Sequence, residues 1–115
     1  MHLPELEPAT SRSTLRIPPG LSLPLTPRLQ AAIDTPEMRR LARVGQLGLV
    51  SLVYPGAVHS RFEHSLGVFR LAVAFVDRLQ ADTTFAELVS SEDASAFLAA
   101  SLLHDVGHWP FCHPI

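Results

Sequence analysis

Histidine and aspartate residues of a metal-ligating type gather in two stretches of this 115-residue chain. His64 follows a helix start signal, while His104 and Asp105 stand together at the end of a very apolar segment. Imidazole nitrogens combined with a carboxylate oxygen suit Fe, Mn, Zn or Co better than Ca. An aspartate beside an apolar run is also costly to bury without a cation nearby. The pattern therefore predicts that His64, His104 and Asp105 bind one metal ion.

Further residues suited to phosphate chemistry stand close to these three in the sequence. Arg61 precedes His64 by one helical turn on the same face, where a guanidinium can clamp a phosphate oxygen. His108 and His113 follow the His-Asp pair, and neutral imidazoles beside a metal can exchange protons with a phosphoester. The ordinary alternatives are a surface ion pair for Arg61 and exposed loop positions for the two histidines. Their grouping favours phosphoester cleavage at a metal.

Two predicted helices must carry the metal ligands. Ser60 to Glu63 has the S-x-x-E form of a capping box, and the apolar spacing that follows predicts a long helix to about Gln80. Ser90 caps a second, almost wholly apolar helix that ends at His104. Neighbouring residues on a regular helix point about 100° apart. A helix end relaxes that limit, so both residues of the His-Asp pair can face one ion.

The remaining elements are short. Thr-Pro start signals predict helices at about 27–33 and 36–44. Residues 49–54 are apolar and partly β-branched, which fits a short strand and a buried irregular link equally well. A short helix is expected at 85–89. The sequence therefore predicts an all-α fold with a short extended segment near 49–54.

Composition limits the other classes of protein. The chain is 47% hydrophobic and 17% charged, which argues against disorder, and its net charge of −2 makes nucleic acid an unexpected partner. No apolar run has the length of a membrane span, and the single cysteine fits a reducing compartment, so we expect a cytoplasmic protein.

Residues 1–25 are proline-rich and predict an extended or poorly ordered arm before a domain at 26–115.

Several motifs in order resemble the HD-domain phosphohydrolases, in the branch of the deoxynucleoside triphosphate triphosphohydrolases. The resemblance covers about residues 26–115. The stretches that carry it are Gln46-Leu47-Gly48, Val53-Tyr54-Pro55-Gly56-Ala57, Arg61-Phe62-Glu63-His64-Ser65-Leu66-Gly67-Val68, and Leu103-His104-Asp105-Val106-Gly107-His108 followed by Pro110-Phe111 and His113.

The resemblance implies the N-terminal part of the HD helical fold and hydrolysis of dNTPs to deoxynucleoside and inorganic triphosphate. It implies a divalent transition metal (Fe, Mn, Zn or Co), Mg, or both, and a homo-oligomer. The residue roles that it implies are three of four metal ligands at His64, His104 and Asp105, a phosphate contact at Arg61, sugar and base contacts at Gln46 and Leu47, and catalytic histidines at His108 and His113.

The sequence departs from the family pattern in places. Arg16 to Gly20 stands where the family usually has D-P-I/V-H-G, and Trp109 replaces a small residue. The chain ends at Ile115 before the family's distal aspartate ligand, so we expect a truncated chain whose activity is open. The alternatives are an HD phosphohydrolase or phosphodiesterase on another nucleotide, and a non-catalytic nucleotide-binding or assembly module.

Overall fold

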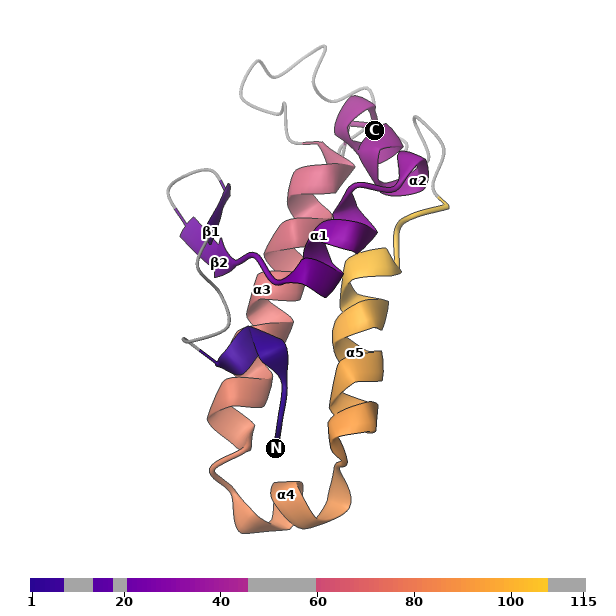
Figure 1. Ribbon diagram of the computed structural model, residues 1–115. Coiled ribbons are helices and arrows are strands. Elements are labelled where there is room, and N and C mark those ends of the chain that lie inside the picture. The colour runs from indigo at the N-terminus through magenta and orange to yellow at the C-terminus, as the bar shows by residue number, and fades with distance from the viewer. Residues whose placement is uncertain (8–13, 18–20, 46–59, 108–115) are drawn as a thin grey trace.

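The computed structural model describes residues 1–7, 14–17, 21–45 and 60–107. Two long helices, α3 (Arg61–Leu79) and α5 (Ser91–Leu103), lie side by side and are joined by the short helix α4 (Thr83–Leu88) (Figure 1). The predicted all-α architecture is therefore confirmed. The extended segment expected near 49–54 lies outside the described residues.

Side-chain caps fix where these helices begin. The Ser60 hydroxyl accepts a hydrogen bond from the backbone N–H of Glu63, and Asp82 accepts one from Phe85 at the start of α4. Ser90 and Asp93 form a full capping box at α5, each side chain accepting from the other's backbone N–H. Such caps satisfy backbone donors that the first helical turn leaves unpaired. The start of α3, where the site lies, is therefore set by local chemistry.

The N-terminal half forms short elements that cover α3 and α5. Helices α1 (Pro27–Ile33) and α2 (Pro36–Arg40) begin at the predicted Thr-Pro signals, with Thr26 and Thr35 as caps. The helix expected at 36–44 ends earlier as an α-helix, because its last turn tightens into the 3₁₀ helix η2 (Leu41–Arg43) before Val44 becomes extended.

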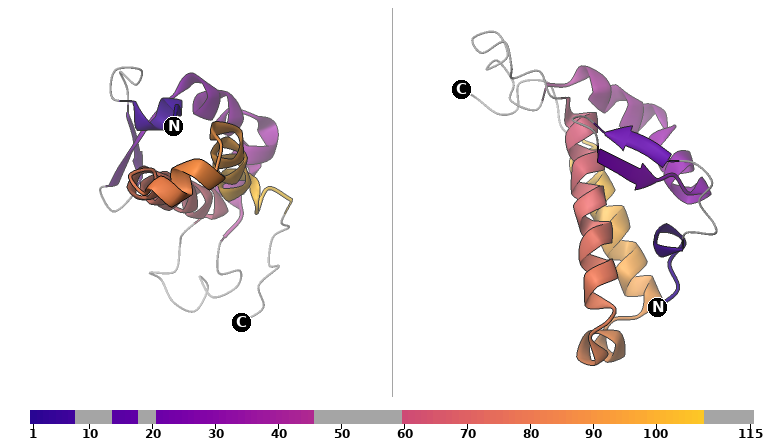
Figure 2. Two further views of the ribbon diagram at one scale, coloured as in Figure 1. Left: turned by 90° about the horizontal axis from the view of Figure 1, so that it is seen from below. Right: turned by 90° about the vertical axis from the view of Figure 1, so that its left-hand side faces the viewer.

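The proline-rich arm contains regular structure. A 3₁₀ turn, η1 (Pro4–Leu6), precedes a two-stranded antiparallel hairpin of β1 (Thr14–Ile17) and β2 (Leu21–Pro24), which lies beside α3 (Figure 2). Leu3 and Leu23 are each only 1% exposed and belong to the hydrophobic core. Burial of these two leucines holds the arm against the helices. A division of the chain at residue 25 stays a prediction.

One face of each of α1, α2, η2, α3 and α5 supplies the core, while α4 has no buried residue. The buried stripe of α3 repeats at three- and four-residue spacing, as the apolar pattern predicted. The core residues of the helices are Leu29, Ile33, Met38, Leu41, Leu66, Phe69, Ala72, Val73, Val76, Ala94, Leu98 and Leu102. In the described ranges no helix is both long and apolar enough to cross a membrane.

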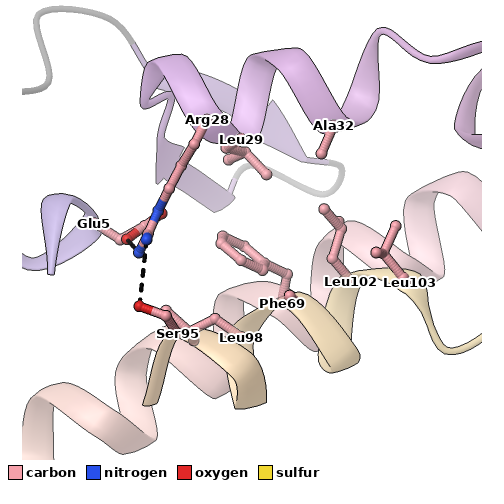
Figure 3. A pocket seen from close by; sticks show the side chains of 10 residues that line it. Glu5, Arg28, Leu29, Ala32, Phe69, Ser95, Leu98, Leu102 and Leu103 are labelled. Atoms are coloured by element: carbon pink, nitrogen blue, oxygen red, sulfur yellow. Dashed lines mark hydrogen bonds and ion pairs between the residues drawn. The ribbon is translucent and has the colours of Figure 1, made fainter. Parts of the chain in front are cut away.

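An ion pair joins the arm to α1 in the lining of a cavity of about 200 Å³ (Figure 3). Arg28 donates from Nε to Glu5 at 2.7 Å and from Nη2 to the other oxygen of the same carboxylate. Its Nη1 donates to the Ser95 hydroxyl on α5 at 3.3 Å. The Glu5 carboxylate is almost fully buried, and its bidentate contact joins the arm to α1, while Arg28 also joins α1 to α5 through Ser95.

Candidate metal centre

His64, His104 and Asp105 converge where α3 begins and α5 ends. One ligand atom from each of the three lies within 4.8 Å of the other two. Asp105 Oδ2 is 3.5 Å from His64 Nε2 and 3.4 Å from His104 Nε2. The sequence placed these residues on two separate helices, and the packing of α3 against α5 brings them together.

A hydrogen bond to the backbone orients the His104 ring. Its Nδ1 lies 2.8 Å from the carbonyl oxygen of Ser101. A carbonyl can only accept, so Nδ1 carries the proton and donates. In the neutral ring, Nε2 then holds an unshared pair, and this is the atom that faces Asp105. A backbone carbonyl on the far nitrogen is a common way of fixing a metal-binding histidine.

The chemistry of this donor set fits a cation. When both imidazoles are neutral and turn a nitrogen lone pair toward the Asp105 carboxylate, three electron-rich atoms lie close together. That arrangement is unfavourable unless a positive charge lies between them. Two ligands about 2.1 Å from an ion lie about 3 to 3.5 Å apart at angles of about 90 to 110°. The distances from Asp105 Oδ2 to the two imidazoles, 3.5 and 3.4 Å, agree with that spacing.

Arg61 lies behind the carboxylate. Its side chain is 1% exposed, and Nη1 donates to Asp105 Oδ2 at 3.2 Å. The sequence pattern indicated a phosphate contact for Arg61 rather than this buried ion pair. A signal was present, since Arg61 and the buried Ser65 stand four residues apart and continue the core stripe of α3 through Phe69. A charged residue at the head of an apolar stripe indicates a buried partner of opposite charge.

The segment formed by α2, η2 and the two residues after it contacts both halves of the site. The backbone N–H of Arg61 donates to the carbonyl of Val44 at 2.8 Å, and Gly45 pairs with Ser60 in an isolated antiparallel bridge. Arg40 donates from Nη2 to the carbonyl of Val106 at 2.9 Å. Sequence reasoning missed these contacts because they join residues far apart in the chain.

Four other predicted site residues lie outside the described residues: Gln46, Leu47, His108 and His113. Of the predicted set, the structure brings together His64, His104, Asp105 and Arg61.

Comparison with known proteins agrees with this geometry. Residues 61–115 match the family model described as "HD domain". This range contains α3, α4, α5 and the whole triad of His64, His104 and Asp105. Residues 61–115 are therefore similar to an HD domain, and the relatives that share this region include proteins named deoxynucleoside triphosphate triphosphohydrolase.

Three relatives illustrate the similarity. The Dictyostelium discoideum homologue of deoxynucleoside triphosphate triphosphohydrolase SAMHD1 is 46% identical over 70% of this chain and 16% of its own length. The Homo sapiens enzyme is 45% identical over 77% of this chain and 14% of its own length. An uncharacterized protein of Methanocaldococcus jannaschii is 40% identical over 72% of this chain and 16% of its own length. The alignments thus span only 14 to 16% of the length of each relative.

Proposed function

We propose that this chain is part of a metal-dependent phosphohydrolase that cleaves deoxynucleoside triphosphates to deoxynucleoside and inorganic triphosphate. The observation that carries the proposal is the convergence of two imidazole nitrogens on one buried carboxylate oxygen, 3.5 and 3.4 Å away. The substrate class rests on relatives whose names state that activity.

The proposed cofactor is one divalent transition metal, Fe, Mn, Zn or Co, held by His64, His104 and Asp105. Two nitrogens and one oxygen favour these metals over Ca and over Mg alone, which prefer oxygen ligands. When bound, such an ion polarises a phosphoryl oxygen and lowers the pKa of a water ligand. Mg remains the alternative for binding the triphosphate itself.

The chain's own residues have distinct proposed roles. The buried Arg61 orients the Asp105 carboxylate and adds positive charge at the place where a phosphate would approach. His108 and His113 are proposed to transfer protons at the scissile phosphate. Gln46 and Leu47 are proposed to contact the sugar and base.

Metal analysis tests the first part of the proposal. We expect the purified chain, incubated with Mn²⁺ and desalted, to retain close to one equivalent of Mn²⁺, and His104→Ala to lose it. The matched control is His2→Ala, which removes an exposed histidine that pairs with Glu7. Equal retention by wild type, His104→Ala and His2→Ala would exclude the triad as the binding site.

Product analysis tests the substrate class. Each dNTP is incubated with the Mn²⁺-loaded protein, and the phosphate products are separated. Inorganic triphosphate supports the proposal, while orthophosphate supports a phosphohydrolase that acts on another bond or nucleotide. Absence of turnover together with saturable dNTP binding supports the second candidate, a non-catalytic nucleotide-binding module.

We also propose that the chain forms homo-oligomers and is cytoplasmic. Several large apolar side chains of α3, α4 and α5 are solvent-exposed, namely Leu71, Phe75, Leu79, Leu88, Phe97 and Leu103. Phe75, Leu79 and Phe97 line one hollow, and contiguous exposed apolar surface is typical of an interface. The cytoplasmic location rests on the single cysteine.

A further inference from the structure

Arg40 links the N-terminal half of the fold to the turn that carries two of the proposed metal ligands. The guanidinium, on α2, donates from Nη2 to the carbonyl oxygen of Val106 at 2.9 Å, across 66 residues of sequence. Figure 1 shows α2 at the same end of the molecule as the start of α3 and the end of α5. The contact therefore lies beside the metal centre without being part of it.

The turn that receives this contact has little regular structure of its own. Helix α5 ends at Leu103, and residues 104–107 form a turn. Within it, the N–H of Val106 donates to the carbonyl of Leu103 at 3.0 Å. His104 and Asp105 belong to this turn, so its backbone conformation decides where two of the three ligand atoms lie.

The base of the Arg40 side chain is fixed. Met38 and Leu41, on either side of it in sequence, are 0% exposed and belong to the core. Thr35 caps α2 by accepting from the N–H of Met38. The guanidinium thus projects from a packed helix, and its hydrogen bond to Val106 transmits that fixed position to the turn.

The same segment also holds the other half of the site. Val44 accepts a hydrogen bond from the N–H of Arg61 at 2.8 Å, and Gly45 bridges Ser60. These contacts fix the first turn of α3, which carries His64. Residues 36–45 therefore contact both the first turn of α3 and the 104–107 turn, whose spacing must be kept for the triad to converge.

We infer that Arg40 is a positioning residue for the metal centre, holding the 104–107 turn so that His104 and Asp105 keep their approach to His64. The metal part of this inference rests on the proposed function. Residues that orient ligands from outside the coordination shell typically change metal affinity by about 10- to 100-fold when they are lost. The hydrogen bond has a charged donor, and charge-assisted hydrogen bonds are stronger than those between neutral groups.

The test compares Arg40→Met, which keeps the apolar stem and removes the donors, with Arg43→Met. Arg43 is an exposed arginine three residues later, in η2. The first measurement is hydrogen exchange at the Val106 amide in the metal-free full chain. We expect exchange about 10-fold faster in Arg40→Met and unchanged in Arg43→Met, because loss of the tether lets the turn open locally.

The second measurement is Co²⁺ titration, followed by the visible absorption of the bound ion. Arg40→Met should bind Co²⁺ about 10-fold more weakly, with an altered spectrum, and Arg40→Lys should recover part of the affinity. The urea midpoints of Arg40→Met and Arg43→Met should agree, which separates positioning from general destabilisation.

Two results are decisive against the inference. Unchanged exchange at Val106 in Arg40→Met would overturn it whether or not the protein binds metal. Wild-type affinity for Co²⁺ in that variant would overturn the link to the metal centre. Failure of the wild type to bind Co²⁺ would instead reject the proposed function and the metal part of this inference. The exchange measurement would still test whether the Arg40–Val106 hydrogen bond holds the 104–107 turn.

Discussion

Arg61 Nη1 lies 3.2 Å from Asp105 Oδ2, although the two residues are 44 positions apart in sequence. Both side chains are nearly excluded from solvent, at 1% and 10% exposure. This contact joins the first turn of α3 to the turn after α5. As a buried ion pair, the contact contributes to stability. Because the same carboxylate faces two imidazoles, the arginine also helps to orient a proposed metal ligand.

Removal of the arginine is expected to destabilise the metal-free protein. Arg61→Met leaves a buried carboxylate without its guanidinium, and breaking such a buried pair costs about 3 kcal/mol of unfolding free energy. Urea denaturation measures the loss, with Arg78→Met, an exposed arginine at the end of the same helix, as the control. Equal midpoints for the two variants would contradict the prediction. The double variant Arg61→Met/Asp105→Asn should lose less stability than the sum of its single changes.

Metal is expected to stabilise the fold through the triad. A ligand that binds only the folded state adds about 2.7 kcal/mol to the free energy of unfolding at 100 times its Kd. Urea denaturation with saturating Mn²⁺ should therefore show a raised midpoint in the wild type and in His2→Ala. His104→Ala should show no rise. A rise of the same size in His104→Ala would indicate that the ion binds elsewhere.

Stability is expected to fall in acid through Glu5. Burial acting alone would raise the pKa of Glu5. Hydrogen bonds and charge from Arg28 outweigh burial and hold that pKa below its ordinary value of 4.5, and hydrogen bonds from the Glu5 backbone and Thr26 lower it further. A carboxylate with a lowered folded-state pKa stabilises the fold above pH 4.5, and this contribution is lost as the pH falls toward and through the folded-state pKa. Glu5→Gln should flatten the stability profile over that window.

The control for this experiment is Glu87→Gln, which changes an exposed glutamate on α4. Its free energy of unfolding should follow the wild-type pH dependence. Parallel profiles for Glu5→Gln and wild type would show that the Glu5–Arg28 pair does not control acid stability.

The exposed apolar side chains are expected to drive self-association. Phe75 is 62% exposed and Phe97 48% exposed, and both line a hollow of about 380 Å³ between the end of α3 and the first half of α5. The double variant Phe75→Ser/Phe97→Ser should shift the light-scattering mass toward the monomer. Met1→Ser, which removes a 40% exposed methionine elsewhere, should leave the mass unchanged. A monomeric wild type would contradict the prediction.

Local signals predicted most of the secondary structure. The Thr-Pro pairs set the starts of α1 and α2, and Ser60 and Ser90 set those of α3 and α5. Each signal acts within one helical turn, so it can be read without knowledge of the fold.

Contacts between distant segments were not predictable in the same way. The pairing of Arg61 with Asp105 and the tether from Arg40 to Val106 depend on how α2, α3 and α5 pack. The burial of Leu3 and Leu23 was likewise hidden, because their neighbouring prolines indicated an extended arm. The motif resemblance identified the triad, and tertiary packing supplied the residues that support it.

The placement of α4 at one end of the helix pair and the triad at the other has a mechanical consequence. The 13 residues of α5 span about 20 Å at the usual helical rise. A pivot of about 3° at the α4 connection would then displace His104 by about 1 Å relative to His64. The α4 connection and the proposed ligands thus lie at opposite ends of α5, so a change in the angle of α5 at that connection would alter the spacing of the triad without replacing any of its residues.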